Sequence, residues 1–158
     1  MNKKVVIGAD HAGFKLKEHL KKFLTNKKYL VLDKGAKTYN STDDYPDYAK
    51  KVTKEIKQEI KGILICGSAE GICIAANKFK GIRAVAVRNV KLAKLTRKHD
   101  DANVLCLAGG ATKDSDAHVG LSNKQAEKIV IAWLNTEFSG EERHKRRIEK
   151  IKKLEQRG

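Results

Sequence analysis

Short, uninterrupted apolar runs recur along the chain, each bounded by small or polar residues. Four are rich in β-prone side chains and cover residues 4–8, 62–66, 83–87 and 103–110, and a fifth lies at 29–33. Their apolar residues are continuous rather than alternating, which is typical of parallel strands covered on both faces. We therefore expect a mostly parallel five-stranded sheet.

Apolar residues at helical spacing fill the gaps between these runs. They form three groups: Leu16, Leu20, Phe23 and Leu24; Val52, Ile56 and Ile60; and Leu92 with Leu95. Strands that alternate with helices predict an α/β fold with right-handed crossovers, here a Rossmann-like three-layer α/β/α sandwich. The length of 158 residues suits a single domain spanning 1–158.

The end of the chain predicts a further helix at about 140–156. Ser139 is followed three residues later by Glu142, the spacing of a capping box. Ile148, Ile151 and Leu154 then form one apolar strip, which would pack on this domain or on a partner subunit. The preceding polar segment, 109–124, is expected to be a surface loop.

The charge adds one question to this picture. Thirty-four lysines and arginines give a formal net charge of +15, which would attract phosphorylated metabolites, nucleic acids or acidic membranes. Most of the lysines lie on the expected helix faces, and aromatic residues make up only 6%, too few for a platform that stacks single-stranded bases. A solvated lysine-rich surface is the better interpretation, and nucleic-acid binding is disfavoured.

No apolar run reaches the length needed to span a bilayer, and the first residues lack the layout of a signal peptide. We expect a soluble, cytoplasmic protein without a membrane partner. The three cysteines form no CxxC pair, so we expect reduced thiols and neither a disulfide framework nor a zinc site.

One cysteine stands out by its position. Cys66 ends an apolar run and is followed by Gly67-Ser68-Ala69-Glu70-Gly71. A thiol between a strand end and a helix start would face free amide N–H groups and the helix dipole, which favour the thiolate, and the same amides could bind an anion. The alternative is a buried structural cysteine beside a tight turn. Cys73 and Cys106 lie within apolar patterns and are expected in the core.

Other candidates are individually ambiguous. Asp10 and His11 follow the first strand and could line a crevice there, or Asp10 could cap the next helix. His99 could transfer protons or interact with a helix end. Arg143 and Arg147 share a helix face and could clamp a phosphate, or belong to a solvated surface.

Taken together, the motifs "GADHAGFKLK", "DYPDYA", "ICGSAEGICIAANK", "GIRA", "RKHDDANVL" and "ERHKRRIEKI" resemble, in order and from residue 4 to about 151, the ribose/galactose isomerase family, which includes ribose-5-phosphate isomerase type B. The resemblance implies a homodimer, sometimes paired into tetramers, with active sites built across the subunit interface. It also implies aldose–ketose isomerisation of ribose 5-phosphate and ribulose 5-phosphate, through an enediolate and without metal or cofactor, as in the pentose phosphate pathway.

The resemblance also implies residue roles. Cys66 would be the base that moves the proton, because Ile72 stands where other members can carry a glutamate instead. Ser68 and the amides of 67–71 would stabilise the enediolate oxygen, and His99 would open the sugar ring. Tyr45 would line the pocket. The substrate-binding residues would be Asp10, His11, Gly67, Ala69, Glu70, Gly71, Asp100, Arg143 and Arg147.

Three positions depart from the pattern of the family. Ala69 stands where a glycine is usual, and would be strained if that position needs a positive φ. Asp100 replaces an asparagine, and Gly110 replaces an arginine of the phosphate site, for which Lys113 could substitute as a point charge. Two alternatives therefore stay open. One is an isomerase of another aldose phosphate, such as galactose or allose 6-phosphate; the other is a non-catalytic binder of sugar phosphates or nucleic acid.

Overall fold

The computed structural model describes residues 3–57, 59–110 and 119–155. Within these residues, five strands form one sheet in the order β2-β1-β3-β5-β4, and every neighbouring pair is parallel. The strands are β1 (Lys4–Ala9), β2 (Leu30–Asp33), β3 (Lys61–Cys66), β4 (Ala84–Ala86) and β5 (Val104–Ala108). The predicted strands are confirmed, and the sheet is entirely rather than mostly parallel.

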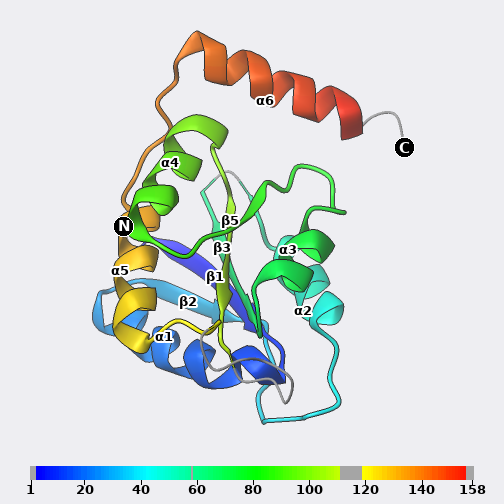
Figure 1. Cartoon of the computed structure of the whole chain (residues 1–158), viewed down its shortest axis with the longest axis vertical. Helices are drawn as coiled ribbons and strands as arrows, with labels where there is room; N and C mark the ends of the chain where they lie inside the picture. The colour runs from blue at the N-terminus through cyan, green and yellow to red at the C-terminus, as the bar shows by residue number, and fades with distance from the viewer. Residues whose placement is uncertain (1–2, 58, 111–118, 156–158) are drawn as a thin grey trace.

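Helices cover both faces of the sheet, so the predicted three-layer architecture is confirmed (Figure 1). α1, α4 and α5 lie on one face, and α2 and α3 lie on the other. The elements are a short 3₁₀ turn (His11–Gly13), α1 (Phe14–Asn26), α2 (Tyr45–Thr53), α3 (Glu70–Ala76), α4 (Val90–Asp100), α5 (Asn123–Leu134) and α6 (Glu142–Leu154). No helix in the described part of the chain has the length and apolar character that crossing a membrane requires.

The central strand β3 divides its side chains between two hydrophobic cores. Ile63 and Ile65 face the core under α1 and α5, whereas Leu64 and Cys66 face the core under α2 and α3. This alternation follows from the two-residue repeat of a strand. It directs the Cys66 sulfur toward the α3 side of the sheet.

Two helical predictions need correction. α2 ends at Thr53, so Ile56 does not continue it; Ile56 lies in the turn that follows and packs against the α2–α3 core from there. The region expected to be a loop, 109–124, ends in the first residues of α5, and its residues 111–118 lie outside the described part of the chain. Ser122 begins α5 with a capping box formed by Gln125.

The C-terminal helix α6 begins at Glu142, and its start differs from the prediction. The N-cap residue is Glu141, and Ser139 does not cap the helix; its Oγ lies 2.8 Å from Nδ1 of His144. Of the predicted apolar strip, Ile148 is buried against the domain, whereas Ile151 and Leu154 are 42% and 65% exposed. α6 lies across one end of the molecule and packs on α4 (Figure 1).

Candidate active site

The carboxyl ends of β1, β3 and β5 form one rim. Ala9 pairs with Ile65, so the next residue on each strand, Asp10 and Cys66, comes at the same level. The amide of Gly109, just after β5, donates to the carbonyl oxygen of Cys66 at 2.8 Å. Open α/β sheets place their ligands beyond this edge, and the structure brings the predicted Asp10 and Cys66 loops together there.

Cys66 lies at the end of β3 with only 4% of its surface exposed. Burial raises the pKa of the Cys66 thiol above its ordinary value of 9.0, although hydrogen bonds from the amides of Ile72, Ala69 and Ser68 act in the opposite direction. The negative charge of Asp10 raises this pKa further. The amides act as expected, because they lower the pKa and so favour the thiolate, but desolvation outweighs them and the net pKa is raised.

The loop after Cys66 is held in a conformation that few residues adopt. Ala69, the N-cap of α3, has φ 76°, so this position does require a positive φ. The ring of Tyr45 packs directly over Gly71, where an added Cβ would lie 2.7 Å from the ring. Tyr45, the first residue of α2, therefore covers the loop that follows Cys66. The Ser68 hydroxyl accepts from the amide of Glu70 at 3.4 Å.

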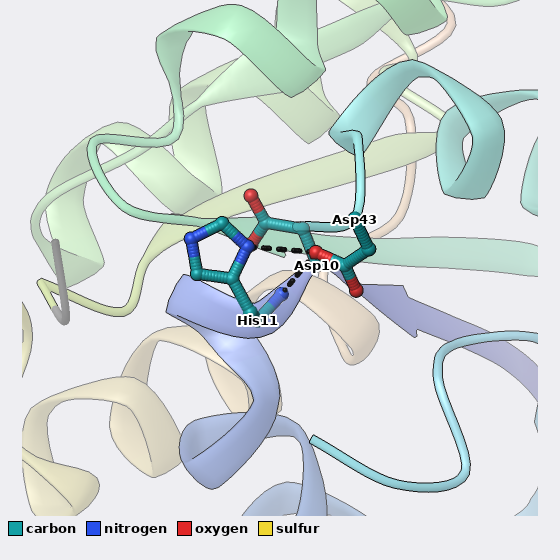
Figure 2. A group of neighbouring side chains, drawn as sticks. All are labelled: Asp10, His11 and Asp43. Atoms are coloured by element: carbon teal, nitrogen blue, oxygen red, sulfur yellow. Dashed lines mark hydrogen bonds and ion pairs between the residues drawn. The ribbon is translucent and has the colours of Figure 1, made fainter. Parts of the chain in front are cut away.

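Asp10, His11 and Asp43 converge beside this loop (Figure 2). Asp10 caps the 3₁₀ turn, which is one of its two alternatives, because its carboxylate accepts from the amide of Gly13 at 3.1 Å. Oδ1 of Asp43 lies 2.7 Å from Nδ1 of His11 and also accepts from the His11 amide at 2.9 Å. Its other oxygen accepts from the Tyr48 hydroxyl at 3.0 Å. Asp43 was missed in the sequence, because nothing in its spacing indicates that it meets His11, 32 residues away.

Charges in this cluster act on each other. Burial raises the pKa of Asp10, and the nearby Asp43 carboxylate adds to this, while the Gly13 amide and His11 lower it. Burial, reinforced by the bond to Asp43, raises the pKa of Tyr48 to about 12, so its hydroxyl stays protonated. One ligand atom from each of Asp10, His11 and Asp43 lies within 4.8 Å of the others. These three residues could hold a divalent cation.

His99 and the two predicted arginines lie elsewhere in the chain. His99 is in the last turn of α4, which leads into the amino end of β5, whereas Cys66 pairs with Ala108 at the carboxyl end of that strand. The strand between them spans about 13 Å at ~3.3 Å per residue, far beyond hydrogen-bonding reach. The His99 ring packs on His144 of α6, with 4.4 Å between ring centroids.

Asp100, Arg143 and Arg147 share this distant location. Arg143 is exposed on α6 and pairs with Glu141 at 2.8 Å, and Arg147 and Asp100 are also exposed. One chain therefore does not bring these predicted residues to Cys66.

Two cavities of the molecule also lie away from Cys66. One of about 620 Å³ is at the amino ends of the strands, lined by residues such as Lys3, Lys61 and Asn103. The other, of about 930 Å³, lies between α1, α4 and α5. None of the predicted site residues lines either cavity, so the carboxyl rim is the candidate site on the basis of its chemistry rather than its volume.

The profile of the Ribose/Galactose Isomerase family matches residues 5–151. The chain is 42% identical over 157 residues to ribose-5-phosphate isomerase B of Escherichia coli, covering 98% of each protein. It is 40% identical over 158 residues to a probable ribose-5-phosphate isomerase B of Mycoplasma genitalium, covering 98% of this chain and 97% of that protein.

Solved structures of similar proteins belong to the same family. A crystal structure of ribose-5-phosphate isomerase B from Mycoplasma genitalium with bound ribulose-5-phosphate has a TM-score of 0.88 at 39% identity, covering 98% of this chain and 97% of the other. The corresponding structure from Thermotoga maritima has a TM-score of 0.87 at 41% identity, covering 97% and 99%. With the family profile matching nearly its whole length, the chain belongs to the ribose/galactose isomerase family.

Proposed function

We propose that this protein is an aldose–ketose isomerase that interconverts ribose 5-phosphate and ribulose 5-phosphate. The observation that carries the proposal is the position of Cys66. Its sulfur ends a central parallel strand beside Asp10, and the backbone amides of Ser68, Ala69 and Ile72, which follow it in the chain, act to lower its pKa. The resemblance of the whole chain to ribose-5-phosphate isomerase B proteins supports the same reaction.

In the proposed mechanism, Cys66 as thiolate removes the proton from C2 of the open-chain aldose. The electrons of that C–H bond form the C1=C2 double bond, and the C1 carbonyl oxygen takes up the negative charge. Amides of the 67–71 loop are placed to stabilise this enediolate. Transfer of the 2-hydroxyl proton to O1 and return of a proton from the thiol to C1 complete the ketose.

The raised pKa of Cys66 has two opposite effects on this step. It lowers the fraction of thiolate near neutral pH, and it makes the thiolate that does form a stronger base. We propose that Asp10 and His11 contact the sugar hydroxyls next to this sulfur. Asp43 then holds the His11 ring through Nδ1 and leaves Nε2 available for the substrate.

We further propose that the active site is completed by a second copy of the chain. His99, Arg143 and Arg147 lie at the opposite end of the molecule from Cys66, so they can serve only the Cys66 of a partner. The exposed Ile151 and Leu154 of α6 provide an apolar surface for such a contact. In this homodimer, a partner's His99 would open the sugar ring, and a partner's Arg143 and Arg147 would help to hold the phosphate.

The reaction is tested with purified protein in the presence of EDTA, using ribose 5-phosphate and a panel of six-carbon aldose 6-phosphates. We expect turnover of ribose 5-phosphate with the highest kcat/KM of the panel, loss of activity in Cys66→Ser, and retention in Cys73→Ser as a matched cysteine control. A preference for a six-carbon phosphate would reassign the substrate. Full activity of Cys66→Ser would remove the proposed base, and dependence on added metal would assign the Asp10–His11–Asp43 cluster a metal instead.

The shared site is tested by mixing two inactive proteins, Cys66→Ser and His99→Asn. After random subunit exchange about half of the dimers are mixed, and each mixed dimer has one site with both changes and one with neither. We expect recovery of about one quarter of wild-type activity, because about one quarter of all sites are then intact. If Cys66 and His99 served the same site within one chain, mixing would restore nothing.

A further inference from the structure

A cation that the sequence did not single out lies at the Cys66 rim. Arg88 follows β4 at the carboxyl end of the sheet. Among the described arginines it is the one at this rim, because Arg83 and Arg97 bond to Asp101 at the amino end and the others lie on α6. The substrate of the proposed reaction carries a phosphate dianion on C5, so the rim must bind this charge while C1 and C2 lie at Cys66.

The guanidinium of Arg88 joins the two loops that border the rim. It donates to the carbonyl oxygen of Ser68 at 3.4 Å, to the Glu70 carboxylate at 3.1 Å, and to the carbonyl oxygen of Val119 at 3.4 Å. The side chain remains 50% exposed, so it is accessible to a ligand. The Arg88 guanidinium therefore lies against the loop that follows Cys66, and its planar fork is suited to bidentate phosphate contacts.

The residues after β5 explain why the phosphate-binding cation would follow β4 and not β5. Gly110 has φ 73°, and an added Cβ would lie 2.6 Å from Cα of Gly120. This position thus excludes an arginine side chain, which the family resemblance leads one to expect there. Arg88 donates to the carbonyl oxygen of Val119, so its guanidinium bonds to the residue that precedes Gly120, the close neighbour of Gly110.

We propose that Arg88 binds the phosphate group of the substrate in this chain, a role that rests on the proposed isomerase function. In the free protein Glu70 occupies part of the guanidinium. A phosphate dianion, with its greater charge, displaces the exposed Glu70 carboxylate, and the carbonyls of Ser68 and Val119 keep the fork in place. Arg88 then selects phosphorylated sugars, and Glu70 competes with them.

The experiment compares Arg88→Gln and Arg88→Lys with Lys91→Gln, a matched control that removes one exposed charge from the start of α4. Steady-state kinetics give kcat and KM for ribose 5-phosphate, and calorimetry gives the Kd of inorganic phosphate without requiring turnover. We expect Arg88→Gln to raise both KM and Kd at least about tenfold, as for loss of a charge-assisted bond, with little change in kcat. Arg88→Lys should fall between it and wild type, and Glu70→Gln should lower KM.

The outcomes separate this role from a structural one and from failure of the proposed function. If Arg88 only braces the loop, Arg88→Gln and Glu70→Gln will both lower kcat and Tm, and phosphate affinity will stay at the wild-type value, which overturns the proposal. Equal effects of Arg88→Gln and Lys91→Gln overturn it as well. If the wild type does not isomerise ribose 5-phosphate, the proposed function fails, and the phosphate Kd still decides whether Arg88 binds the anion.

Discussion

Replacing Ala69 with glycine tests the strained loop beside Cys66. A left-handed conformation such as φ 76° costs a non-glycine residue about 1–2 kcal/mol, which glycine recovers. Glycine loses about 0.4–1 kcal/mol through the greater freedom of the unfolded chain. Removal of the methyl group, which is only 3% exposed, loses about 0.8 kcal/mol more. The terms nearly cancel, so we expect Ala69→Gly to change the free energy of unfolding by less than about 1 kcal/mol.

The informative comparison is Ala126→Gly, a fully buried alanine inside α5. That change loses a similar methyl and about 1 kcal/mol of helix propensity with no strain to relieve, so it should cost about 2 kcal/mol. At about 2–4 °C per kcal/mol for a chain of this size, its Tm should fall by about 4–8 °C, against less than about 4 °C for Ala69→Gly.

The single tryptophan, Trp133, is fully buried and reports unfolding in urea by its fluorescence. Equal destabilisation by the two glycine substitutions would refute the reasoning, since it would mean that the Ala69 backbone carries no strain. A loss larger than that of Ala126→Gly would mean that the methyl group itself anchors the loop.

Three further changes test the electrostatics. Because burial raises the pKa of Cys66, kcat/KM for ribose 5-phosphate should climb through the neutral range by up to about tenfold per pH unit, and a plateau by pH 7 would contradict the raised pKa of this thiol. Asp43→Asn removes the carboxylate that holds the His11 ring, so kcat/KM should fall at least about tenfold; an unchanged kcat/KM would contradict the role of Asp43. Burial acts to raise the pKa of Asp33, but its ion pairs, including that with Lys17, outweigh burial and lower the pKa. The Asp33 carboxylate therefore stabilises the fold at neutral pH, and this stabilisation is lost as the pH falls through its folded pKa. The Tm difference between wild type and Asp33→Asn should therefore be largest near pH 7 and shrink below about pH 4.

The strands could be predicted because each one is buried on both faces. The run from Gly62 to Cys66 has almost no polar residue, and only a covered parallel strand suits such a run. The end of α2 could not be predicted in the same way, because Ile56 continues the helical spacing while packing on the core from a turn. The spacing of apolar residues predicts which side chains are buried, but it does not predict whether the backbone at those residues is a helix or a turn.

The residues of the candidate site also fall into a group that the sequence could place and a group that it could not. Asp10 and Cys66 could be placed together from the sequence, because the carboxyl ends of neighbouring parallel strands share one rim. Asp43 and Arg88 could not, because their positions depend on the paths of loops that no periodic pattern describes. The net pKa of Cys66 could not be predicted either, since the sequence indicates the nearby amides but not the depth at which the sulfur is buried.

The direction of a parallel sheet connects these features to the proposed assembly. All strands point the same way, so loops after strands meet at one rim and the ends of helices such as α4 lead back to the other. A chain whose proposed base, Cys66, lies at the first rim and whose His99 lies at the second cannot join them by any loop movement that keeps the sheet intact. Two copies can do so if each offers its second rim to the first rim of the other, and a two-fold axis satisfies both requirements at once. Strand direction thus supports the proposed homodimer, and Arg88 is the proposed phosphate ligand that each chain would supply to its own Cys66 without a partner.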